Sequence, residues 1–129
     1  MNKKMTLSGE YAAMVQDAAD ALRAGETAAS LVCIREAMML RMDAPEPHNL
    51  LGILCEMKSD DNGARRHYRA AYALDPTYKP ACRNLERLVR FEWGPANRQY
   101  DYGVEPKQVE NADHQQAIPE LKREGLGTA

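Results

Sequence analysis

The chain has 129 residues, of which 44% are hydrophobic, 28% are charged and 6% are aromatic, and its formal net charge is -2. This length suits a single domain, and the small net charge offers no general attraction to nucleic acid or to an anionic membrane surface. Alanine, leucine and methionine are plentiful, and because these side chains lose little entropy in a helix, the composition favours an all-α fold.

Neither a membrane span nor a secretion signal is predicted. No apolar run is long enough to cross a bilayer, and the basic start of the chain is not followed by an apolar core. We therefore expect a cytoplasmic protein. Its cysteines occupy apolar helical positions without any CxxC pair, so we interpret them as small hydrophobic residues rather than as disulfide or metal ligands; they are Cys33, Cys55 and Cys82.

The first part of the chain predicts two helices joined by a tight turn. Apolar residues recur at helical spacing over residues 11–24, and Ser8 is a candidate N-cap for this helix. Gly25 interrupts the pattern, and residues 27–42 predict a second helix. Two helices connected in this way form an αα-hairpin.

A second helical hairpin follows. Asp43 is the candidate cap of a helix that covers about residues 45–58. Asp60 is the candidate cap of the next helix. We expect that helix to end near Leu74, because Pro76 cannot continue the ladder of backbone hydrogen bonds.

The two hairpins repeat each other in sequence. Met14, His48 and Cys82 are spaced by 34 residues, and a period of this length with two helices per period indicates a helical repeat. Residues of matched size recur at the same spacing; the pairs are Gly25 with Ser59, Ser30 with Ala64, Ile34 with Tyr68, Ala37 with Ala71, and Leu40 with Leu74.

Residues 48–76 resemble a tetratricopeptide repeat (TPR), whose pattern is a large residue, Leu-Gly, a second large residue, Ala, an aromatic residue, Ala and Pro. The resemblance implies that the paired helices cross closely at small residues, because larger side chains would force them apart. In this chain the pattern is carried by His48, Leu51, Gly52, Cys55, Ala64, Tyr68, Ala71 and Pro76.

A third unit predicts only one helix, at residues 78–93, because Gly94 and Pro95 interrupt it. The expected fold is an all-α, short TPR-type α-solenoid with two helix-turn-helix repeats, at about 11–44 and 45–78, and a C-terminal capping helix. This helical domain covers residues 1–95. Residues 96–129 are polar and predict an irregular, flexible C-terminal tail, in which residues 100–104 are the stretch most suited to docking.

The chemistry of the side chains argues against an enzyme. The histidines lack metal-ligand spacing with a carboxylate or a thiolate. The sequence also contains no glycine-rich phosphate loop and no GxSxG motif. We expect no catalytic residue, no metal site and no cofactor; the histidines concerned are His48, His67 and His114.

The TPR resemblance implies a concave groove lined mainly by the first helix of each hairpin. Arginines lie within two turns of the last helix and favour a partner segment with carboxylates, although a solvated helix face explains such a row equally well. By register, the expected partner-binding residues are Val15, Ala19, Asn49, Leu50, Ile53, Met57, Arg83, Asn84, Arg87, Arg90 and Phe91.

Three hypotheses of function follow. The first is a small protein–protein interaction module, an adaptor or chaperone-like protein, that binds a partner peptide or helix in the groove. The second is a structural, self-associating homodimer, with the C-terminal tail docked on the groove or on a dimer mate. The third places the acidic, tyrosine-bearing residues 100–105 in the groove until a partner displaces them. The partner is expected to be another protein, without nucleic acid or membrane.

Overall fold

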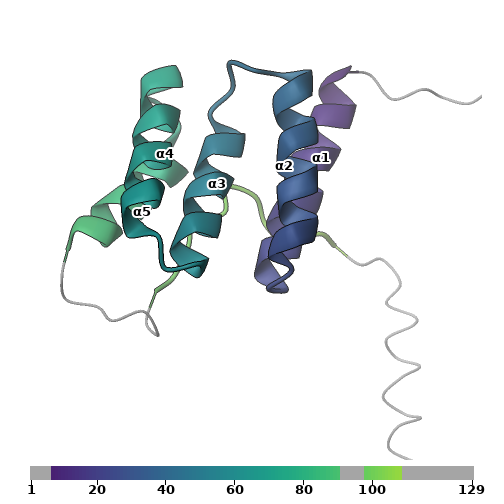
Figure 1. Cartoon of the computed structure of the whole chain (residues 1–129). Coiled ribbons are helices and arrows are strands. Elements are labelled where there is room, and N and C mark those ends of the chain that lie inside the picture. Colours follow the sequence, from purple (N-terminus) through teal and green to yellow (C-terminus); the bar gives the residue numbers. More distant parts are fainter. Residues whose placement is uncertain (1–6, 91–97, 109–129) are drawn as a thin grey trace, which may run out of the picture.

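The computed structural model describes residues 7–90 and 98–108. All regular secondary structure in these ranges is helical, which confirms the all-α prediction. The helices pack as two hairpins, α1 with α2 and α3 with α4, and the last helix, α5, packs against α4 (Figure 1). Their bounds are α1 (Leu7–Arg23), α2 (Thr27–Leu40), α3 (Glu46–Met57), α4 (Asp61–Leu74) and α5 (Lys79–Val89).

The first hairpin turns at Gly25, as the sequence predicts. The φ angle of Gly25 is 76°, in the left-handed region that glycine adopts without steric cost. Two details differ from expectation. Helix α1 already includes Ser8, which therefore lies in the first turn rather than at the N-cap, and α2 ends two residues before the expected Met42.

The second hairpin confirms one predicted cap and contradicts another. The Asp60 side chain accepts a hydrogen bond from the backbone N–H of Gly63 at 2.9 Å, so it caps α4. Asp43 does not cap α3, because that helix begins directly after Pro45 and has no side-chain cap. Pro47 in the first turn of α3 has no backbone N–H, so this turn has one unpaired N–H group fewer than usual.

Helix α5 is shorter than the predicted 78–93. It ends at Val89, and Arg90 is in extended conformation. The last turn tightens, since the Arg90 N–H donates to the carbonyl of Arg87, three residues back instead of four. The remainder of the predicted helix, at 91–93, lies outside the described residues.

The helices of the second hairpin approach closely at a small residue. A Cβ atom added to Gly52 on α3 would overlap the ring of Tyr68 on α4. Tyr68, Ala64 and Ala71 on α4 are fully buried. The structure therefore confirms that a small residue, Gly52, lies where α3 and α4 approach closely.

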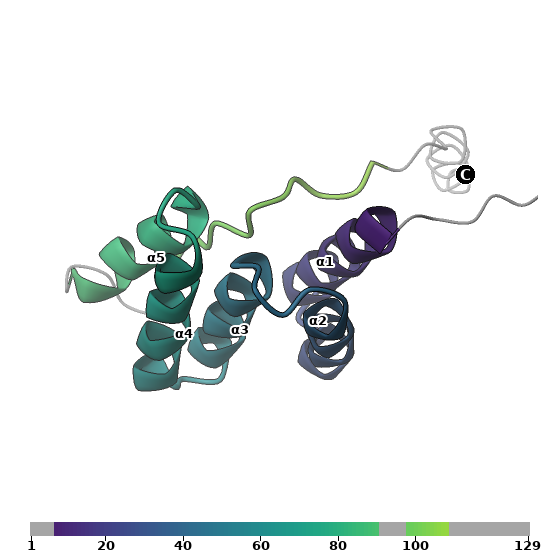
Figure 2. The same ribbon diagram turned by 90° about the horizontal axis from the view of Figure 1, so that it is seen from above.

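Beyond α5, residues 98–108 form an extended segment without helix or strand. Figure 2 shows this segment passing along one side of the row of helices, from the α5 end towards α1. Tyr100, Tyr102 and Val104 pack against the buried core. Part of the sequence expected to be a tail is thus held against the helical domain. None of the described helices has the length and apolar character needed to cross a membrane.

Candidate functional site

The candidate site is a groove between the helices and the extended segment. We call residues 98–105 the docked segment, because they contact side chains of α1, α3 and α5. A hollow of about 780 Å³ opens beside the docked segment, and we call this hollow, together with Asn49, the groove. Its helical lining is polar and basic, and consists of Arg23, Pro80, Arg83, Asn84 and Arg87.

Two buried asparagines bind the backbone of the docked segment at Asp101. The Asp101 N–H donates to Asn84 Oδ1 at 2.9 Å, and the Asp101 carbonyl accepts from Asn84 Nδ2 at 2.9 Å and from Asn49 Nδ2 at 3.0 Å. Asn84 Nδ2 also donates to Asn49 Oδ1 at 2.8 Å, which fixes the orientation of both amides. With the docked segment in place, Asn49 and Asn84 are only 0% and 1% exposed, so their hydrogen bonds with Asp101 are shielded from water.

Arginines contact the side chains of the docked segment. Arg83 Nη1 lies 2.7 Å from Asp101 Oδ2, but the Arg83 side chain is 61% exposed, so solvent screens this ion pair. The Arg23 guanidinium lies 4.5 Å from the ring centroid of Tyr102. The Arg87 guanidinium lies 5.2 Å from that of Tyr100. These distances suit cation–π attraction, so two basic side chains contact the aromatic rings on either side of Asp101.

The end of the docked segment lies against α1 and the start of α5. Gln16 Nε2 donates to the carbonyl of Glu105 at 2.8 Å, and Arg23 donates to the carbonyl of Val104. Gly103 has a φ angle of 83°, and a Cβ atom added to it would overlap the hydroxyl of Tyr78. Glycine is therefore required at this position for two independent reasons, its backbone conformation and the lack of space.

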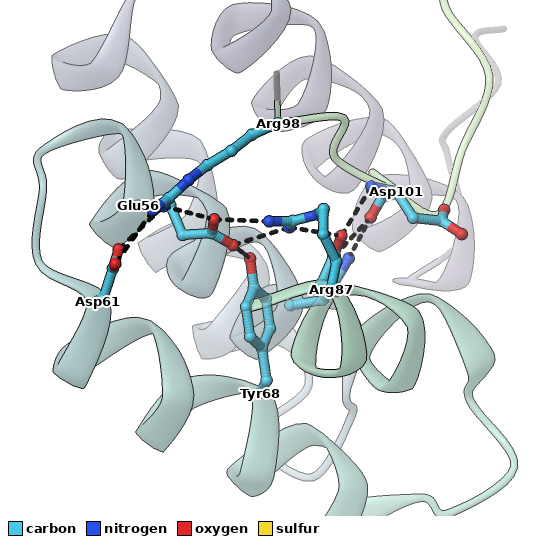
Figure 3. A network of polar contacts seen from close by, with 8 residues as sticks. Glu56, Asp61, Tyr68, Arg87, Arg98 and Asp101 are labelled. Atoms are coloured by element: carbon cyan, nitrogen blue, oxygen red, sulfur yellow. Dashed lines mark hydrogen bonds and ion pairs between the residues drawn. The ribbon is translucent and has the colours of Figure 1, made fainter. Parts of the chain in front are cut away.

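A buried ionic network joins the helices to the start of the docked segment (Figure 3). The Glu56 carboxylate is 0% exposed and accepts a bidentate pair of hydrogen bonds from Arg87, at 2.8 and 2.9 Å. It also accepts from the Tyr68 hydroxyl at 2.6 Å and from Arg98 at 2.9 Å. All of these donors satisfy one buried carboxylate, whose charge would otherwise be costly to desolvate.

Arg98 extends this network to a second carboxylate. It donates to the two oxygens of Asp61 at 2.9 and 3.1 Å, in addition to its bond with Glu56. Hydrogen bonding from Arg98 holds the pKa of the Asp61 carboxyl below its usual range. Because Arg98 is the first residue of the docked segment, these contacts fix the segment to α3 and α4.

The structure brings only some of the predicted groove residues to the docked segment. Asn49, Arg83, Asn84 and Arg87 contact it directly. The apolar candidates are instead part of the buried core or packed against it; these are Val15, Ala19, Leu50, Ile53 and Met57.

Two predicted groove residues remain. Arg90 is exposed at the end of α5 and is not among the described residues that contact the docked segment. Phe91 lies outside the described residues.

Sequence reasoning left several contributing residues out of the predicted set. Glu56 is seven residues beyond Asn49 on α3, and Arg23 is seven residues beyond Gln16 on α1. Seven residues are about two helical turns, so each pair shares a face. Extending the register along α3 from the predicted Asn49 would have found Glu56, whereas Arg23 shares its face of α1 with Gln16, another contributing residue outside the predicted set. No local pattern indicates Arg98, whose partners are 37 and 42 residues away.

Comparison with known proteins leaves the chain without an assigned family. No model of a protein family, no curated protein and no solved structure matches it. Over the described residues, histidine, cysteine and carboxylate side chains form no group of three that could hold a metal ion. The chemistry of the groove is therefore the basis for a function: amides that pair with a peptide backbone, and guanidinium groups beside acidic and aromatic side chains.

Proposed function

We propose that this chain is a TPR-type protein–protein interaction module, an adaptor or chaperone-like protein rather than an enzyme, that binds an extended peptide in its groove. The observation that carries the proposal is the asparagine pair, which meets both the N–H and the carbonyl of Asp101. Every residue except proline offers these two backbone groups, so the same pair suits an extended peptide from another protein.

The TPR-type architecture is supported by the repeat and by the helix crossing. Equivalent residues recur every 34 positions, and Gly52 on α3 leaves no room for a Cβ atom beside the ring of Tyr68 on α4. In such an array the first helices of successive hairpins line one face. The contacts of the docked segment with α1, α3 and α5 follow that alternation.

The proposed partner carries carboxylates. Arg83 pairs with Asp101, and Arg23 and Arg87 lie in the same groove. Guanidinium groups bind carboxylates through charge-assisted hydrogen bonds, so an acidic segment is favoured over a basic one. The exposure of Arg83 implies that this contact contributes more to selection and association rate than to affinity.

Selection from a random peptide library with the full chain tests this function. We expect selected peptides to be acidic, and Arg83→Glu to weaken their binding by about fivefold to tenfold, because reversing one charge replaces attraction by repulsion. Arg90→Glu is the matched control, since it makes the same change at the exposed residue that follows α5, away from the described contacts of the docked segment. Failure to select any peptide, both with wild type and with a Gly103→Ala variant that strains the docked segment, would contradict the proposal. Equal binding of the selected peptides by wild type, Arg83→Glu and Asn84→Ala would contradict it as well.

A further inference from the structure

We propose that the groove recognises a four-residue pattern, Tyr-Asp-Tyr-Gly, and that the partner protein presents this pattern in an extended segment. The chain's own copy, at residues 100–103, competes with the partner and covers the groove in its absence. This inference rests on the proposed function, because it names the class of peptide that the same groove binds.

The second position of the pattern requires an acidic residue. The asparagine pair holds the backbone of Asp101, which points the Asp101 side chain at Arg83. The same carboxylate accepts a hydrogen bond from the N–H of Gly103 at 3.0 Å, so it also shapes the turn that follows. A side chain of this length performs both tasks, because a carboxylate bonded to the N–H two residues on is the geometry of an Asx turn.

The first and third positions require aromatic rings. The rings of Tyr100 and Tyr102 meet edge to face, with centroids 6.1 Å apart, and each lies beside its own guanidinium group, from Arg87 and Arg23 respectively. Arg87 is held in place by its bidentate bond to Glu56. The Arg87 guanidinium is thus fixed before the ring of Tyr100 arrives, which limits the entropy lost on binding.

The fourth position is the most restrictive. Gly103 combines a φ angle of 83° with contact to the hydroxyl of Tyr78, so any other residue would be strained at this point. Because Tyr78 belongs to the helical domain and not to the docked segment, this restriction applies equally to a peptide from another protein. The groove therefore discriminates by shape at the glycine and by charge at the aspartate.

Releasing the docked segment by changing the segment alone tests the inference. The full chain with Gly103→Ala keeps every groove residue but strains its own copy of the pattern. We expect a labelled peptide of the sequence RQYDYGVE to bind Gly103→Ala about tenfold more tightly than wild type by fluorescence anisotropy, because the tethered copy, at an effective concentration on the order of millimolar, no longer competes. Asp101→Lys is a second variant that should release the docked segment, because it replaces the ion pair with Arg83 by repulsion between two positive charges.

Controls separate the pattern from general opening of the groove. Glu105→Ala should leave peptide binding at the wild-type level, because Glu105 contributes its backbone carbonyl to Gln16. Peptides with alanine for glycine, or asparagine for aspartate, should bind the released chain at least about fivefold more weakly than RQYDYGVE.

The possible failures are distinguishable. Should RQYDYGVE bind neither released variant while library peptides of another pattern bind them and depend on Asn84, the four-residue pattern is wrong and the proposed function stands. Should no peptide of any sequence bind the released variants, both proposals fail, and the docked segment is only a structural part of the domain. Equal affinity of RQYDYGVE for wild type and for both variants would show that the docked segment does not compete with the peptide for the groove.

Discussion

Replacing Glu56 by glutamine is predicted to be the most damaging change within the polar network of Figure 3. The carboxylate is fully buried and accepts hydrogen bonds from Arg87, Arg98 and Tyr68. Glutamine has nearly the same volume, but its NH₂ group is a hydrogen-bond donor and would face a guanidinium group. The substitution also removes the negative charge that compensates Arg87 and Arg98.

The expected loss of stability follows from the burial of the partners. Removing one member of a buried ion pair costs about 3–5 kcal/mol, mostly because the remaining charge stays desolvated. The side chains of Arg87 and Arg98 are 14% and 15% exposed, so some water reaches them and the lower end of that range applies. A loss of about 3 kcal/mol corresponds to a decrease in Tm of about 12–24 °C for a domain of this size.

Urea unfolding followed by circular dichroism measures this loss, with Asp61→Asn as the matched control. Asp61 bonds the same Arg98, but its side chain is 38% exposed, so its replacement should cost less than about 1 kcal/mol. The reasoning is refuted if Glu56→Gln costs less than about 1 kcal/mol, or no more than Asp61→Asn. Either result would mean that water already solvates the network.

Two further predictions concern the helical domain. Gly52→Ala should lower the free energy of unfolding by about 1–3 kcal/mol, because the added Cβ overlaps the buried ring of Tyr68; a thermal melt with an unchanged Tm would contradict this. His48 and His67 stack with ring centroids 5.9 Å apart, and burial lowers the pKa of both. The folded state then binds fewer protons than the unfolded state, so stability is complete above about pH 6.5 and falls as the pH drops below it. The urea midpoint should therefore be lower at about pH 5.5 than at about pH 7.5, and the difference should be smaller in His67→Gln. An equal difference in that variant would show that the histidine pair is not its cause.

The fold was largely predictable because its determinants are local or periodic. The turn at Gly25 and the cap at Asp60 each follow from residue type and spacing, and the close approach of the helices at Gly52 was expected from the TPR resemblance. The expected cap at Asp43 was wrong because α3 begins directly after Pro45, which leaves Asp43 outside the N-cap position. The first and last residues of a helix are set by small free-energy differences to which several residues contribute.

The site was predictable only where the repeat register applies. Asn49 and Asn84 were found in this way, since both lie on groove-facing helices. The register could not show that Val15 and Leu50 would be buried in the core. Helical spacing indicates which residues share a face but not which other elements pack against that face. Nor could it pair Glu56 with Arg98, since that bond depends on how the chain returns after α5 and not on any local preference.

The exchange rate of the Asp101 amide hydrogen, measured by NMR on the full chain, tests the central claim most directly. The Asp101 N–H donates to the buried Asn84, so the amide should exchange at least about tenfold more slowly than in the free peptide RQYDYGVE. Saturating amounts of a groove-binding peptide should then remove this protection while the amides of α3 stay protected. Exchange at the free-peptide rate in the protein alone would show that the docked segment does not occupy the groove.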